Sequence, residues 1–254
     1  MVRLGQNFLS DPNLLDAIVR DAGLGPEDVV LEVGAGEGVL TERLATVAAR
    51  VHVIEIDRGL APALASLAAR GNVDLHWGDA MKLELAGLDP APTAVVSNLP
   101  YAVATPVILR TIAELPSVER WTVMVQREIA DRLRAAPGNR TYGSPSAIVQ
   151  LACEVKLLRT VDPAVFRPRP RVESAILAMR RTGPAADQAT RELIRAAFAH
   201  RRKSLARSVE HVRPGSLNAV RKALEELGLA VDSRAEALAP EDFAALSAKL
   251  RASA

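Results

Sequence analysis

The sequence predicts an α/β domain followed by a small all-helical domain, and two observations carry this prediction. In the first two-thirds of the chain, short runs rich in β-branched residues alternate with stretches of helical periodicity, which is typical of a parallel sheet covered by helices. After Thr182-Gly183-Pro184 the chain becomes rich in Ala, Leu and Arg and keeps only helical spacing. We therefore expect the α/β domain at residues 1–182 and the helical domain at residues 183–254.

The individual elements follow from periodicity and from turn residues. Asp11 and Pro12 resemble the N-cap and the first residue of a helix over Asn13–Asp21. The predicted strands are Val29–Val33, Val51–Glu55, Val73–Trp77, Thr93–Ser97 and Trp121–Gln126. Helices are predicted at Val39–Ala49, Leu60–Arg70, Pro106–Leu115 and Ile129–Ala135. Two further β-like runs, Ala147–Lys156 and Ser174–Arg180, would complete the sheet, and the last predicted helices are Arg191–His200, Leu217–Leu227 and Asp242–Leu250.

Composition excludes several classes of protein. The 254 residues are 49% hydrophobic, enough to bury a substantial core. One Cys, Cys153, excludes a disulfide framework, and four scattered His residues give no metal-ligand spacing, so we expect no metal site. No apolar stretch approaches the roughly 18 residues that span a membrane, and Met1–Ser10 lacks the apolar core of a signal peptide. We expect a soluble, cytoplasmic, monomeric protein without a membrane partner.

Charge is distributed unevenly along the chain. The net charge is +2, yet Arg167–Arg207 holds eleven Lys or Arg residues against three Asp or Glu residues. That segment carries +8, which leaves −6 on the remaining sequence. Such asymmetry indicates a surface for a polyanion, although a merely solvated charged face is the alternative.

The most informative motif is Asn98–Tyr101, which directly follows a predicted strand. Open α/β sheets build their sites at the carboxyl ends of strands. There the side-chain oxygen of Asn98 and the carbonyl of Leu99 can accept hydrogen bonds from an exocyclic amine. Pro100 stiffens the turn, and Tyr101 offers a face for stacking. The motif favours a pocket for a flat ring that bears an amine; a plain strand-ending turn is the alternative.

Three further features predict a pocket for an adenosyl group. The segment Leu31–Gly38 is a strand that enters a glycine-rich turn before a helix, where the backbone can approach a ligand closely. Val39 occupies the place of the third glycine in the dinucleotide fingerprint, which weakens a dinucleotide interpretation. Glu55 ends the next strand and can accept both hydroxyls of a ribose. Asp79 follows the third strand and can accept from an adenine amine.

On these motifs the sequence resembles the ribosomal RNA adenine dimethyltransferases over nearly its whole length. The matching segments are Gly5–Leu9, Leu31–Gly38, Val53–Asp57, Gly78–Ala80, Asn98–Tyr101, Val125–Glu128, Phe166–Val172 and Arg201–Lys203. The resemblance implies a Rossmann-like class I methyltransferase sheet with S-adenosylmethionine as cofactor. Two departures are Ala35, where relatives often have Pro, and Pro145 in the segment Tyr142–Ser146.

The resemblance also implies roles for particular residues. The residues that match the family's cofactor contacts are Asn7, Leu9, Gly34, Glu55, Asp79 and Asn98. Catalysis falls to Asn98, Leu99, Pro100 and Tyr101. Accepting both amine protons of an adenine at Asn98 and Leu99 favours a pyramidal nitrogen, and good alignment can lower the barrier by about 7–11 kcal/mol.

RNA contacts are expected from two segments. A target adenine must leave its paired or stacked position to reach such a pocket. The expected RNA-binding residues are Phe166, Arg167, Arg169, Arg171, Arg201, Arg202 and Lys203. Phe166 is expected to stack on the adenine opposite Tyr101, or alternatively to act as an apolar plug between strands.

The branch of the family that methylates small-subunit ribosomal RNA matches best, because Phe198–Leu205 resembles that branch's Phe-x-x-Arg-Arg-Lys segment. Its members dimethylate two adjacent adenosines near the RNA's 3′ end within an immature 30S-type subunit, late in assembly. The alternatives are a large-subunit adenine dimethyltransferase of the macrolide-resistance type and a non-catalytic RNA-binding assembly factor. A DNA adenine methyltransferase is a weaker alternative, since Leu99 stands where that class usually has Pro.

Overall fold

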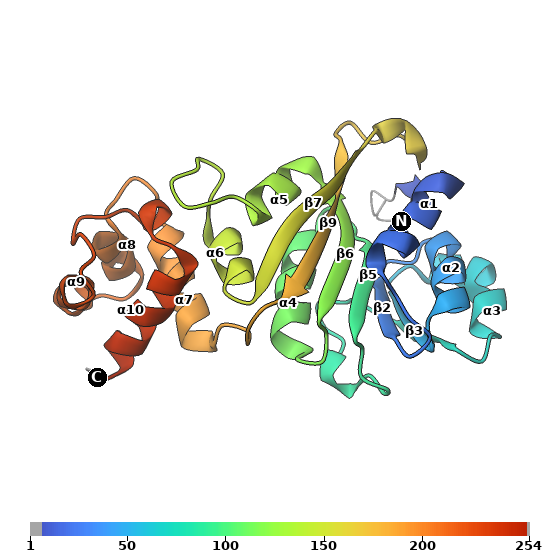
Figure 1. Cartoon of the computed structure of the whole chain (residues 1–254), viewed down its shortest axis with the longest axis horizontal. Coiled ribbons are helices and arrows are strands. Elements are labelled where there is room, and N and C mark those ends of the chain that lie inside the picture. Colours follow the sequence, from blue (N-terminus) through green and yellow to red (C-terminus); the bar gives the residue numbers. More distant parts are fainter. Residues whose placement is uncertain (1–6, 253–254) are drawn as a thin grey trace. The chain divides into compact units, whose positions relative to one another are not determined.

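The structure, a computed structural model, describes residues 7–252 and contains a seven-stranded sheet in the order β4-β3-β2-β5-β6-β9-β7 (Figure 1). The strands are β2 (Val29–Val33), β3 (Arg50–Glu55), β4 (Val73–Trp77), β5 (Ala94–Asn98), β6 (Arg120–Gln126), β7 (Cys153–Val161) and β9 (Ser174–Arg181). The first five are parallel, and β9 is antiparallel to β6. A second, two-stranded sheet pairs β1 (Phe8–Leu9) with β8 (Phe166–Arg167).

The chain divides into two compact units. The first comprises Met1–Ala130 and Glu154–Arg181, and the second comprises Asp131–Cys153 and Thr182–Ala254. From Thr182 onward the whole chain belongs to the second unit. At the same point the sequence changes from alternating strand and helix patterns to helical spacing alone. Residues 131–153, which we expected in the α/β domain, group with the helical unit.

Register explains why the site lies where it does. Val33 of β2 is paired with Ile54 of β3, and Glu55 with Trp77 of β4. On the other side, β5 is paired along its full length with β6, and Asn98 lies opposite Met124. Because these strands are parallel, their carboxyl ends meet at one edge of the sheet. The residues that follow each strand are thereby brought together.

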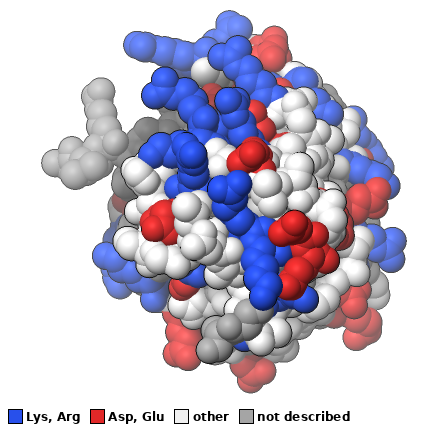
Figure 2. Space-filling model, turned by 90° about the vertical axis from the view of Figure 1, so that its left-hand side faces the viewer, with Lys and Arg blue, Asp and Glu red and all other residues white. Residues whose placement is uncertain are grey.

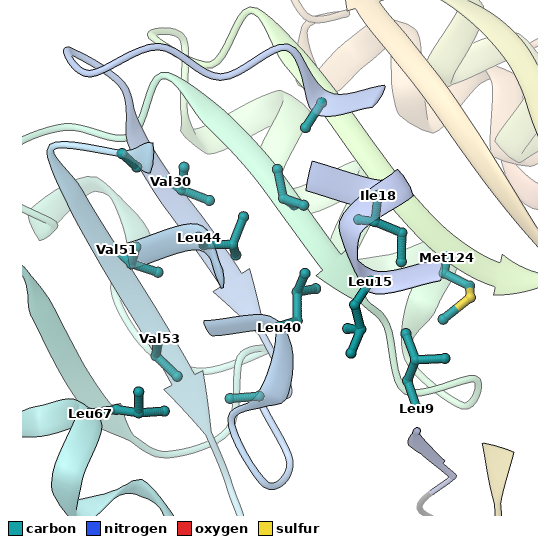
Figure 3. Packing of buried hydrophobic residues seen from close by; sticks show 14 of the residues in the cluster. Leu9, Leu15, Ile18, Val30, Leu40, Leu44, Val51, Val53, Leu67 and Met124 are labelled. Atoms are coloured by element: carbon teal, nitrogen blue, oxygen red, sulfur yellow. The ribbon is translucent and has the colours of Figure 1, made fainter. Parts of the chain in front are cut away.

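Helices cover both faces of the sheet. In the first unit they are α1 (Pro12–Ala22), α2 (Val39–Val47), α3 (Ala61–Ala68) and α4 (Ala104–Glu114), and α5 (Arg127–Leu133) crosses into the second. Helix α1 begins as predicted, because the side chain of Asp11 accepts a hydrogen bond from Leu14 N at 3.0 Å. The helices α1, α2 and α3 bury Leu15, Leu44 and Leu67 against the strands (Figure 3). At helix α4, the Trp121 indole of β6 donates to Thr111 Oγ1 at 3.0 Å.

The β-like run expected at Ala147–Lys156 is wrong for its first half. Residues Ser144–Gln150 form α6, and the strand β7 begins only at Cys153. The reason lies in two polar side chains spaced four residues apart, which share one helix face. Ser146 Oγ donates to the carbonyl of Arg132 at 2.5 Å, and Gln150 Nε2 donates to that of Leu133 at 2.8 Å. Both carbonyls lie at the end of α5, where helical partners run out.

The second unit has its own core. Besides α6 it contains α7 (Gln188–Phe198), α8 (Leu205–Val212), α9 (Leu217–Glu226) and α10 (Pro240–Ala252). The ring of Phe198 lies 5.7 Å from that of Tyr142 and 5.8 Å from that of Phe243, centroid to centroid. The Tyr142 hydroxyl donates to the carbonyl of Leu238 at 3.1 Å. Burial, with the charges of Glu241 and Asp242, raises the pKa of Tyr142, so the ring stays neutral.

Short 3₁₀ helices connect several of these elements: η1 (Arg58–Leu60), η2 (Leu85–Gly87), η3 (Pro163–Val165) and η4 (Ala235–Ala237). None of the helices within residues 7–252 has the length and apolar character needed to cross a membrane.

Candidate active site

The glycine-rich turn after β2 combines left-handed backbone with close packing. Gly34, Gly36 and Gly38 have φ angles of 80°, 59° and 82°. A Cβ atom on Gly34 would lie 3.0 Å from the ring of Pro100, and one on Gly36 would lie 3.0 Å from the ring of Phe8. Any side chain here would therefore strain the backbone and push on a neighbouring ring. The turn after β2 and the turn after β5 are packed directly on each other.

Glu55 closes β3 with its carboxylate buried beneath the same turn. Its side chain is 4% exposed. Oε2 accepts from the backbone N–H of Gly36 at 3.0 Å, while Oε1 accepts from those of Ile56 and Asp57, both at 2.9 Å. These three bonds fix the carboxylate and leave acceptor capacity on its oxygens. The next residue, Ile56, is 52% exposed and presents an apolar surface to the pocket.

Asp79 follows β4 in a turn that an arginine from α4 holds. Asp79 Oδ1 accepts from Met81 N at 2.8 Å. Arg110 donates to the carbonyls of Ala80 and Leu83 in the same turn, and it is paired with Glu114 at 2.7 Å. The guanidinium thus fixes the loop that carries Asp79. Sequence reasoning did not identify Arg110, and its spacing of four residues from Glu114 was the available signal.

The Asn98–Tyr101 turn lies at the end of β5. Leu99 N donates to the carbonyl of Met124 at 3.0 Å, and Asn98 Nδ2 reaches the carbonyl of Asn7 at 3.5 Å. With its amide nitrogen directed to Asn7, the Asn98 oxygen points elsewhere. Within residues 7–252, no donor is bonded to the Asn98 side-chain oxygen or to the Leu99 carbonyl. Two acceptors are therefore left for a ligand.

The segment Asn7–Leu9, which precedes α1, borders the site beside the turns that follow β2 and β5. Phe8 is paired with Arg167 and Leu9 with Phe166 in the β1–β8 ladder. The ring of Phe8 lies over Gly36, as described above. The backbone of Asn7 meets Asn98. This segment therefore bridges the glycine-rich turn and the turn after β5.

All predicted cofactor and catalytic residues line one cavity of about 210 Å³. These residues are Asn7, Leu9, Gly34, Glu55, Asp79, Asn98, Leu99, Pro100 and Tyr101. Ala35 lines the same cavity and is 7% exposed, so the departure from Pro at this position leaves the turn packed. The other departure, Pro145, lies in the first turn of α6, where a missing N–H costs nothing.

Glu32 is a site residue that sequence reasoning did not single out. It lines the cavity from the second-last position of β2, yet it is 1% exposed. Thr41 Oγ1 donates to its Oε2 at 2.5 Å. Burial, and to a lesser extent the charge of Glu55, raises the pKa of Glu32 from 4.5 to about 8. The side chain is therefore mostly protonated at neutral pH. In the sequence, Glu32 could have been identified as a carboxylate within a predicted strand, two residues before the glycine-rich turn.

The prediction that Phe166 stacks on RNA does not fit the structure, because the ring is buried. It is 2% exposed and belongs to the core cluster under α1, so in this structure its ring is no free stacking face. The alternative of an apolar plug is the one that fits. Arg167, Arg169 and Arg171 are exposed, and Asp162 lies 3.6 Å from Arg169 as a solvent-exposed partner.

The three basic residues Arg201, Arg202 and Lys203 of the second unit differ in whether other side chains already engage them. Arg201 donates to the Arg140 carbonyl at 2.9 Å and is paired with Glu236 at 3.0 Å. Lys203 Nζ lies 3.0 Å from His211 Nε2. Arg202 is exposed and has no carboxylate partner among residues 7–252. Figure 2 shows Lys and Arg side chains in a band across the face of the molecule turned to the viewer, with some Asp and Glu side chains among them.

Within the described part of the chain, no cluster of three or more His, Cys, Asp or Glu residues could hold a metal ion. The site's polar groups are instead acceptors on three strand ends and a glycine-rich turn. Comparison with known proteins agrees with this arrangement: the sequence pattern of "Ribosomal RNA adenine dimethylase" matches residues 2–251.

The chain belongs to the ribosomal RNA adenine dimethylase family. A relative from Rubrobacter xylanophilus, named ribosomal RNA small subunit methyltransferase A, is 44% identical over 248 residues, which are 96% of this chain and 92% of the relative. One of the same name from Kineococcus radiotolerans is 46% identical over 255 residues, covering 96% of this chain and 84% of the relative.

Solved structures give the same fold. A dimethyladenosine transferase from Plasmodium falciparum is similar with a TM-score of 0.80 and 26% identity, covering 94% of this chain and 95% of that one. The 23S rRNA methyltransferase ErmE is similar with a TM-score of 0.68 and 28% identity, covering 96% and 100%. The prediction of a Rossmann-like class I methyltransferase sheet with a helical C-terminal region is confirmed.

Proposed function

We propose that this member of the ribosomal RNA adenine dimethylase family transfers methyl groups from S-adenosylmethionine to two adjacent adenosines near the 3′ end of small-subunit ribosomal RNA. The observation that carries the proposal is the convergence of Glu55, Asp79 and Asn98–Tyr101 in one cavity. The names of the relatives, which refer to the small subunit, favour this RNA over the large-subunit alternative. An immature small subunit is the substrate that we propose to test.

The residues of the cavity fit an adenosyl cofactor. The carboxylate of Glu55, held by three backbone N–H groups, can accept from ribose hydroxyls. Asp79 can accept from an adenine amine, with Ile56 offering an apolar face for the ring. Asn7 and Leu9 would close the cavity from the N-terminal side. When bound, S-adenosylmethionine supplies a methyl group that its sulfonium has already activated.

The turn after β5 would do the work on the substrate amine. An adenine amine is a weak nucleophile because the ring delocalises its lone pair. The free oxygens of Asn98 and Leu99 can each accept one of its protons, which favours a pyramidal nitrogen with its lone pair directed away from them. Tyr101 would stack on the base and recover about 1–3 kcal/mol of the cost of moving it out of the RNA. The amine nitrogen would become cationic on taking the methyl group, while the sulfonium would leave as the neutral thioether S-adenosylhomocysteine. A dedicated general base is unnecessary, since the cationic nitrogen is acidic and can lose its proton to solvent.

The RNA itself would be held by charge. Arg167, Arg169 and Arg171 alternate with prolines in an irregular segment of the first unit, and all three are exposed. In the second unit Arg202 and Lys203 can contact phosphates, while Arg201 is partly occupied by Glu236. Each phosphate contact that forms releases counterions, so RNA affinity should fall steeply with salt.

The test is methyl transfer from labelled cofactor to small subunits that lack the two dimethyladenosines. We expect label on two adjacent adenosines near the 3′ end. Asn98→Ala should still bind RNA, but at saturating cofactor it should lose roughly a hundredfold or more in rate, because each 1.36 kcal/mol of barrier is about tenfold. The matched control is Asn218→Ala, an exposed position on α9, which should keep the normal rate.

Other outcomes would select the alternatives. Label on a single adenine of large-subunit RNA, with none on the small subunit, would assign the large-subunit reaction. Tight binding of small subunits without transfer, in a protein that also fails to bind S-adenosylmethionine by calorimetry, would indicate a non-catalytic assembly factor.

A further inference from the structure

A buried serine contacts the far end of the Tyr101 ring. Tyr101 Oη lies 2.6 Å from Oγ of Ser174, although the two residues are 73 positions apart. Ser174 is the first residue of β9 and is 0% exposed. Its backbone is held in the sheet, where it lies opposite Gln126 of β6. The serine is thus a fixed point, set by a strand that takes no other part in the cavity.

This hydrogen bond restricts the orientation of Tyr101. The tyrosine sits in a turn whose backbone is closed by the bond from Val103 N to the carbonyl of Pro100, at 3.0 Å. A side chain on such a turn could still rotate about its two χ angles. The bond to Ser174 fixes the ring at its other end as well. Rotation would leave a fully buried serine hydroxyl without its partner, which is costly.

The same bond defines what the phenol can do. Its hydroxyl is occupied by Ser174, so it is not directed at a substrate. Burial raises the pKa of Tyr101, opposed in part by the Ser174 hydrogen bond, and the phenol stays protonated in the neutral range. What the side chain offers the cavity is therefore its aromatic face.

We propose that Ser174 is a positioning residue that holds Tyr101 in the orientation in which its face meets the target adenine. The inference rests on the proposed function, because a target base must enter the cavity for the ring to matter. Small errors in the placement of reacting groups are costly in rate. A serine that fixes the ring should therefore influence the methyl-transfer step without contacting substrate or cofactor.

The experiment compares Ser174→Ala, Tyr101→Phe and the double variant in single-turnover methyl transfer to small subunits, with cofactor and RNA both saturating. Each single variant should lose roughly ten- to a hundredfold in rate, and the double variant should be no slower than the worse single one, because all three lack the same bond. Cofactor and RNA dissociation constants should stay within about twofold of wild type. Ser174→Thr, which keeps the hydroxyl, should restore most of the rate.

The matched control is Ser208→Ala, which removes a buried serine hydroxyl of the second unit that donates to the Ala196 carbonyl at 2.7 Å. It should leave the rate unchanged. A tyrosine Raman doublet that shifts in Ser174→Ala, but not when the same change is made in a Tyr101→Phe background, would report the lost bond directly. If Ser174→Ala fails to fold, Tyr101→Phe breaks the same bond from the other side.

The outcomes separate this inference from the proposed function. An active wild type with an equally active Ser174→Ala variant would overturn the positioning role and leave the function standing. Independent, multiplying losses in the double variant would also overturn it, since Ser174 would then act by another route. A wild type that methylates no adenine would overturn both.

Discussion

Replacing the buried acid Glu32 with glutamine should change how stability depends on pH. In the unfolded chain its carboxyl ionises near 4.5, whereas in the folded protein burial raises the pKa to about 8. Between these values the folded state holds a proton that the unfolded state has lost, so the free energy of unfolding falls as pH rises. The loss is about 1.4 kcal/mol per pH unit inside the window. From pH 5 to pH 8 it amounts to roughly 3–4 kcal/mol.

Glu32→Gln removes the titrating group but keeps the shape and a partner for Thr41. The assay is urea unfolding of wild type and variant at pH 5, 6, 7 and 8. At pH 5 the two proteins should have similar stability, and the variant should become progressively more stable relative to wild type towards pH 8. All other titrating groups are shared, so the difference between the curves isolates Glu32. Parallel curves across the range would refute the reasoning.

Three further predictions follow from single contacts. Gly34→Ala should weaken S-adenosylmethionine binding at least tenfold, as measured by calorimetry. A residue with a β-carbon pays about 1–2 kcal/mol to adopt the left-handed backbone, and this β-carbon would also press on Pro100. Unchanged affinity would contradict the prediction. Arg202→Ala should lower the log–log salt slope of RNA binding by about one without changing the Tm, whereas Arg201→Ala should also lower the Tm, since it breaks the pair with Glu236. Burial and the neighbouring His52 lower the pKa of His76, so stability should fall as pH drops below 6.5, and His76→Gln should reduce that acid sensitivity in urea unfolding at pH 5 and 7.

Strands were predictable because β-branched runs between turn residues leave few alternatives. Val29–Val33 and Val73–Trp77 have the bounds that the sequence indicates. Ala147–Lys156 failed because a short apolar run suits a buried helix as well as a strand. There the side chains of Ser146 and Gln150 decide the outcome by bonding to carbonyls of another segment. The sequence around Ser146 and Gln150 does not indicate that these carbonyls lie nearby.

The candidate site likewise has features that the local sequence predicts and features that depend on contacts between distant segments. The convergence of Glu55, Asp79 and Asn98 in one cavity was predictable, because parallel strands bring their carboxyl ends to one edge of the sheet. The role of Phe166 was not, since its burial depends on pairing with Leu9 more than 150 residues earlier. Ser174 and Arg110 were missed for a related reason. Each acts on a loop that is distant in sequence, and only the register of the sheet or the packing of a helix reveals the contact.

Gly34 and Pro100 show why the two strongest motifs belong to one structural unit. A glycine after β2 is expected wherever a cofactor approaches the backbone, and a proline after β5 is expected wherever a turn must be stiff. In this protein the ring of Pro100 lies 3.0 Å from the position that a β-carbon of residue 34 would take. The absence of a side chain at Gly34 thus lets the turn after β5 pack closely against the turn after β2. Under the proposed function, this one contact would set both the place of the methyl donor and the place of the amine acceptors, and a change at either residue should disturb both.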